Sequence, residues 1–71
     1  SLSPGCCLVG EVGLAGEVRP CPRTGARLRE ASRLGFTRGV VSSFEEKQLG
    51  GDMEVVRVGS LSEAMAALFP R

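Results

Sequence analysis

A glycine-punctuated segment, residues 10–20, constrains the fold of this chain more than any other part; it reads Gly-Glu-Val-Gly-Leu-Ala-Gly-Glu-Val-Arg-Pro. Apolar side chains occupy positions of one parity here, which predicts a strand with a single apolar face formed by Leu8, Val12 and Leu14. Gly16 can adopt the positive φ that closes a short hairpin loop. Residues 17–19 then resume as a second strand, which Pro20 ends because proline has no N–H for a ladder. This segment therefore predicts an N-terminal β-hairpin.

Residues 24–34 are expected to form an amphipathic helix. Thr24 is a suitable N-cap residue, and Gly35 is a suitable stop. Helical spacing places three apolar side chains on one stripe: Leu28, Ala31 and Leu34. Two arginines lie opposite this stripe and two more lie at its margin: Arg29, Arg33, Arg23 and Arg27. The helix should therefore have a cationic outer face.

Two strands and a second helix are expected in the rest of the chain. Residues 36–42 form a short apolar run that suits a strand covered on both faces, and residues 54–58 form another strand. Residues 44–49 are expected to form a helical turn between them. Ser60 and Glu63 form a capping box that begins a helix with a buried stripe of Leu61, Ala64, Met65 and Leu68. The predicted fold class is α/β (α+β): an N-terminal hairpin, then helix, strand, short helix, strand and helix.

The chain has 71 residues and is long enough for one small domain, which buries only about 60% of its unfolded surface. It has three Phe and no Trp or Tyr, so the core must be aliphatic. No secretory segment and no run long enough to span a bilayer is present. We therefore expect an intracellular, cytoplasmic protein with no membrane partner, or an organellar one if the source is a eukaryote.

The sequence offers no set of residues for a metal or cofactor. A structural zinc site usually has four Cys or His ligands, whereas this chain has three cysteines, Cys6, Cys7 and Cys21, and no His. The cysteines are expected to be free thiols that pack as small apolar residues. The glycine-rich segment lacks the Gly-Lys-Ser/Thr sequence that grips phosphate and magnesium. We expect no metal, no cofactor and no small-molecule substrate.

Five segments together resemble a known family. In chain order they read GEVRP, ARLREA, LGFTR, MEVVRV and LSEA, at residues 16–20, 26–31, 34–38, 53–58 and 61–64. In this order the chain resembles the C-terminal part of the Lon-protease-like domain, most closely the version in DNA-repair (recombination) ATPases of the RadA (Sms) type.

The likeness covers residues 8–69, so residues 1–7 would be a loose leader and residues 70–71 a tail. It implies half of a Lon proteolytic-domain-like (ribosomal S5 domain 2-like) fold. It also implies a partner, either the missing half-domain or other copies of the chain.

The resemblance also predicts that this chain is not an enzyme. Lon peptidases use a Ser and a Lys, and the resemblance places Gly25 where the Lys would stand. The family's serine-bearing segment would precede residue 1. The chain's one lysine, Lys47, lies in a polar connection. In RadA-type proteins the ATPase is a separate domain, so we expect neither peptidase nor ATPase activity here.

A binding or assembly role remains. Residues 19–38 hold six arginines against one acid, Glu30, within a chain of net charge +1. Such a band can be a solvated helix face, which is its ordinary role. The resemblance favours a non-catalytic scaffold that contacts DNA phosphates through Arg29, Arg33, Arg23 and Arg27. The alternatives are a fragment of a Lon-type Ser/Lys peptidase, which Gly25 argues against, and a protein-interaction remnant.

Overall fold

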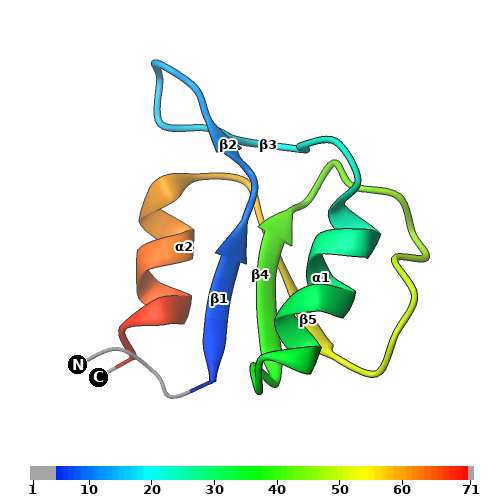
Figure 1. Cartoon of the computed structure of the whole chain (residues 1–71). Helices are drawn as coiled ribbons and strands as arrows, with labels where there is room; N and C mark the ends of the chain where they lie inside the picture. Colours follow the sequence, from blue (N-terminus) through cyan, green and yellow to red (C-terminus); the bar gives the residue numbers. More distant parts are fainter. Residues whose placement is uncertain (1–4, 71) are drawn as a thin grey trace.

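The structure is a computed structural model that describes residues 5–70. Its centre is a parallel three-stranded sheet in the order β1-β4-β5, formed by Cys6–Val9, Arg38–Ser42 and Glu54–Val58 (Figure 1). The central strand β4 is the most deeply buried, with Val40 and Val41 fully inaccessible. This confirms the expectation that the segment is covered on both faces. The predicted strand 54–58 is confirmed at both of its ends.

The two helices, α1 (Thr24–Arg33) and α2 (Leu61–Leu68), cover opposite faces of the sheet. Side chains of consecutive strand residues point to opposite faces. Val40 packs into one core cluster with Ala64 and Leu68 of α2. The neighbouring Gly39 faces α1, where an added Cβ would lie 2.5 Å from Leu28 Cδ2. The result is a three-layer α/β/α arrangement, which confirms the mixed α/β class.

The predicted hairpin is present, but its first strand is interrupted. The run from Leu8 to Leu14 divides at Gly10 into β1 and the two-residue strand β2 (Glu11–Val12). Strand β2 pairs with β3 (Val18–Arg19) in antiparallel register. Gly16 has the expected positive φ of 82°.

The expected apolar face of the hairpin is wrong. Val12 is 49% exposed and Leu14 is fully exposed at the turn, whereas Val18 is inaccessible. The cause is a tertiary contact. Val18 N–H donates to the Gly59 carbonyl and Leu61 N–H donates to the Gly16 carbonyl, which attaches the second arm of the hairpin to the start of α2.

The ends of the helices partly follow the prediction. Glu63 N–H donates to Ser60 Oγ, as the capping box requires, and Gly35 follows α1 with φ of 100°. Thr24, however, is the first residue of α1 and not its cap. The position before it is held by Arg23 with φ of 60°.

The expected apolar stripes are only half buried. Leu28, Ala64 and Leu68 lie in the core, whereas Leu34, Leu61 and Met65 are exposed. Each helix meets only one face of a narrow sheet, so its outer residues reach beyond the covered area.

Two further expectations need correction. Residues 44–49 form no helix; the segment leaves β4 through a turn at Ser43 and Phe44 and then runs as an irregular connection to β5. Cys6 and Cys7, expected in a loose leader, are paired with β4 as the first residues of β1. Residues 1–4 of the expected leader, and Arg71 of the expected tail, lie outside the described residues.

Candidate nucleic-acid interface

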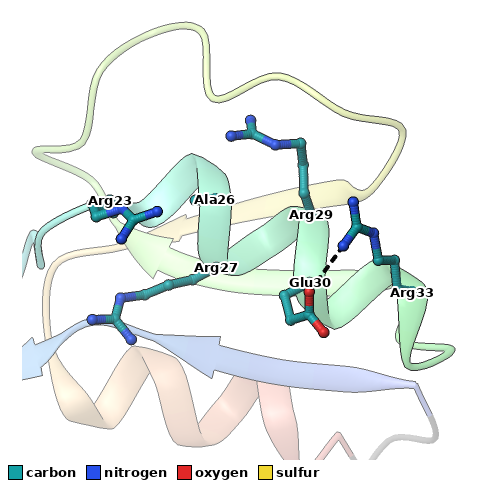
Figure 2. A pocket seen from close by; sticks show the side chains of 6 residues that line it. All are labelled: Arg23, Ala26, Arg27, Arg29, Glu30 and Arg33. Carbon is teal, nitrogen blue, oxygen red and sulfur yellow. Dashed lines mark hydrogen bonds and ion pairs between the residues drawn. The ribbon is translucent and has the colours of Figure 1, made fainter.

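The outer side of α1 and the residue just before it carry the four arginines singled out from the sequence. Arg23, Arg27, Arg29 and Arg33 are all exposed, and they line a solvent-open hollow of about 410 Å³ together with Ala26 and Glu30 (Figure 2). The four side chains are called the arginine face below. Their gathering follows from helical spacing, because the opposite side of α1 buries Leu28 against the sheet.

Two of the four arginines are engaged within the chain. Arg33 Nη1 lies 3.3 Å from Glu30 Oε1. This exposed ion pair joins residues about one helical turn apart. Arg27 Nε donates to the Pro22 carbonyl at 2.9 Å, which holds its side chain toward the start of α1. Glu30 is the one carboxylate among the residues that line this hollow.

The other two arginines are uncommitted. Arg23 and Arg29 make no side-chain hydrogen bond and no ion pair with any residue from 5 to 70. Arg29 extends toward the loop that holds Gly50 and Gly51 (Figure 2), where a Cβ at Gly50 would lie 3.7 Å from Arg29 Nη1. These two guanidinium groups retain all of their donors for an external anion.

Acidic residues limit the arginine face at both ends. Arg27 also borders a second hollow of about 380 Å³, which Glu11 shares. Arg29 and Arg33 border a third of about 250 Å³, which Asp52 shares. The three hollows therefore share arginines, and the two outer hollows each include a carboxylate.

Gly25, the position where the resemblance places a lysine, lies against the connection between β4 and β5. A Cβ on Gly25 would lie only 2.8 Å from the Leu49 carbonyl oxygen. A side chain at this position would have to displace backbone, which is far less adaptable than the end of a flexible side chain. Lys47 is exposed on the same connection.

The contacts that hold this connection in place were not predictable from the sequence. The Glu45 carboxylate accepts the Thr24 hydroxyl at 2.6 Å and the Cys21 N–H at 3.3 Å. Arg57 of β5 donates to three successive carbonyls, those of Glu45, Glu46 and Lys47, at 3.0, 2.6 and 3.0 Å. These partners are separated by 10 to 24 residues, so no local pattern could have identified them.

The cysteines occupy three different environments. Cys6 is buried in the core, and Cys7 points to the other face of β1. Burial, and to a lesser extent the neighbouring Cys6, raises the pKa of the Cys7 thiol. Cys21 Sγ lies 3.3 Å from Thr24 Oγ1. Residues 5–70 contain no group of three or more side chains placed to hold a metal ion.

Neither helix of the described chain combines the length and the apolar character needed to cross a membrane.

Comparison with known proteins identifies relatives, although no family model matches. The chain is 44% identical over 61 residues to DNA repair protein RadA of Pseudomonas aeruginosa. The matched region is 84% of this chain and 14% of that protein.

Other bacterial relatives carry the same name. DNA repair protein RadA of Haemophilus influenzae is 42% identical over 62 residues, covering 86% of this chain and 14% of the relative. The protein of that name in Escherichia coli is 41% identical over 58 residues, covering 80% of this chain and 13% of the relative. The chain thus spans about one seventh of the length of these proteins, and over that span it is similar to proteins named DNA repair protein RadA.

Proposed function

We propose that this chain acts as a non-catalytic segment of a RadA-like DNA repair protein, with a role in assembly and in contact with DNA phosphates. The arginine face is the observation that carries the proposal. Four guanidinium groups, three from α1 and one from the residue before it, line one open hollow, and two of them have no partner among residues 5–70. The relatives named as DNA repair proteins supply the biological context.

The chemistry of the face suits a phosphodiester backbone. Guanidinium groups form charge-assisted, often bidentate hydrogen bonds with phosphate oxygens. No aromatic side chain lines the three hollows of the arginine face, so base stacking finds no support in this part of the chain. We therefore expect contact with the backbone that is insensitive to DNA sequence.

Gly25 supports a non-catalytic role. Activation of a serine nucleophile requires a basic side chain beside it. Gly25 carries no such group, and the Leu49 carbonyl oxygen occupies the space that a side chain would need. This geometry argues against the alternative of a Ser/Lys peptidase segment.

The assembly role is supported by apolar side chains that remain exposed along one edge of α2 and at the residue after it. Leu61, Met65 and Phe69 follow one another at intervals of four residues and are 38%, 46% and 43% exposed. Residues at this spacing lie on one side of a helix. Such a stripe is suited to packing against another protein surface.

The proposal is tested by reversing two charges of the arginine face. In the double variant Arg29→Glu/Arg33→Glu, DNA binding should weaken to the same extent for different sequences. The dependence of log K on log salt should become shallower by about one unit for each phosphate that an arginine no longer neutralises. The measurement is fluorescence anisotropy of a labelled DNA duplex over a series of salt concentrations.

A matched control separates the arginine face from net charge. The variant Arg38→Glu/Lys47→Glu makes the same change in charge at positions outside the arginine face. It should keep a salt slope close to that of the unmodified chain. Equal weakening in the two variants, or unchanged binding in Arg29→Glu/Arg33→Glu, would contradict the proposal and identify the band as a solvated surface.

A further inference from the structure

Glu30 stands out within the arginine face as its one carboxylate. It lies on α1 between Arg29 and Arg33 along the helix and borders the same hollow as all four arginines. Its oxygen Oε1 accepts from Arg33 Nη1 at 3.3 Å, and Figure 2 shows this contact beside the extended side chain of Arg29. An anion that enters the hollow would therefore meet a negative charge next to the guanidinium groups.

We infer that Glu30 limits the phosphate affinity of the arginine face by keeping Arg33 engaged; this inference rests on the proposed function. Arg33 can approach a phosphate fully only if its pair with Glu30 is broken or shared. The pair is exposed, with side-chain exposures of 79% and 61%, so it is weak enough to exchange. Arg23 and Arg29 require no such exchange and form the constant part of the interface.

This arrangement gives Arg33 a different role from that of Arg23 and Arg29. Arg23 and Arg29 would bind at any salt concentration at which binding is measurable. Arg33 would contribute only when phosphate competes with Glu30. The carboxylate thus holds the interaction in a weak and reversible range.

The substitution Glu30→Gln tests the inference. The amide keeps the size of the side chain and removes its charge, and Glu30 is exposed, so the fold should be retained. Affinity for a short DNA duplex at low salt should rise about two- to fivefold. The salt slope should become steeper by about 0.9 as Arg33 neutralises one more phosphate.

Glu54→Gln is the matched control. It also removes one carboxylate and also frees an arginine, because Glu54 Oε1 pairs with Arg38 Nη2 at 3.4 Å. Neither of these residues lines the arginine face. If Glu54→Gln raised the affinity as much as Glu30→Gln, the effect would come from net charge alone, and the inference would be overturned.

The substitution Arg33→Gln tests the mechanism. In an Arg33→Gln background, Glu30→Gln should produce less than half of its original rise in affinity, because no arginine is left to release. A rise that persists in full would overturn the inference. A slope that is unchanged by Glu30→Gln but reduced by Arg29→Glu/Arg33→Glu would overturn it while leaving the proposed function intact. Absence of both effects would overturn the proposed function and this inference together.

Discussion

Glu17 is the residue that ties together the turn of the β2–β3 hairpin. Its carboxylate accepts from Arg19 Nη2 at 2.7 Å and Nε at 3.1 Å, and from the Ala15 N–H at 3.1 Å. A Cβ at position 13 would overlap this carboxylate, so a larger residue there would have to displace the Glu17 and Arg19 side chains. A single exposed side chain therefore organises the turn between two very short strands.

The hairpin is expected to loosen at acidic pH. Hydrogen bonds from Arg19 hold the pKa of the Glu17 carboxyl below its ordinary value. A carboxyl whose pKa is lowered by folding adds stability at pH values above its unfolded pKa, about 4.3, and this stability is lost as pH falls through the lower folded pKa. The amide resonance of Ala15 in NMR spectra should therefore titrate at a pH below the ordinary pKa of a glutamate, about 4.3.

The substitution Glu17→Gln provides the control for this titration. The amide cannot ionise, so the Ala15 resonance of the variant should not change over the same range of pH. An Ala15 resonance that titrates equally in both proteins would show that another carboxyl controls the turn.

At the scale of elements, contacts with α1 and β5 hold the connection between β4 and β5 in place. Thr24, on the first turn of α1, is only 3% exposed. Its hydroxyl has one proton and two oxygen acceptors, Glu45 Oε2 at 2.6 Å and the Cys21 carbonyl at 3.0 Å. The shorter contact with a charged acceptor is the stronger hydrogen bond. Thr24 therefore joins α1 to the connection that covers Gly25.

Replacing Thr24 by Val should destabilise the chain by about 1–3 kcal/mol, because the nearly isosteric side chain leaves the Glu45 carboxylate with one donor fewer. Denaturation in urea would measure the change. Amide hydrogen exchange at residues 45–49 should become faster in the same variant.

Thr37→Val is the matched control. Thr37 is exposed, and its hydroxyl donates to no residue in the described part of the chain. It should change stability by no more than about 0.5 kcal/mol. Equal effects of the two substitutions would show that Glu45 does not hold the connection.

At the scale of the whole molecule, the covered core is small. Eight hydrophobic residues are buried among residues 5–70, and none of them is aromatic. Several large apolar side chains are instead exposed on the hairpin, the connection and both helices: Leu14, Leu34, Phe44, Leu61, Met65 and Phe69. For so small a unit, the gain from burial and the cost in chain entropy nearly cancel.

We therefore expect the isolated 71-residue chain to be marginally stable or to self-associate. Sedimentation and thermal unfolding at several concentrations would measure this. Met65→Glu should reduce association, since Met65 is 46% exposed on α2, whereas Phe44→Ser, in the connection, should not. A monomer at high concentration with a cooperative melt well above about 65 °C would contradict the expectation.

Local patterns in the sequence predicted much of the fold and of the candidate site. Strand 54–58 and the cap at Ser60 were predicted from residues a few positions apart, the cap from a capping box. Helical periodicity placed Arg27, Arg29 and Arg33 around one hollow. These features were predictable because the interactions that produce them act within one or two turns of the chain.

Tertiary structure decided the rest. Residues 44–49 follow an irregular path in which Arg57 donates to the carbonyl groups of Glu45, Glu46 and Lys47, and Thr24 donates to the Glu45 carboxylate. The exposure of Leu14 and the burial of Val18 likewise depend on where the start of α2 meets the hairpin. Each of these outcomes joins residues that are distant in sequence, and the free energy of such contacts exists only once the elements have packed.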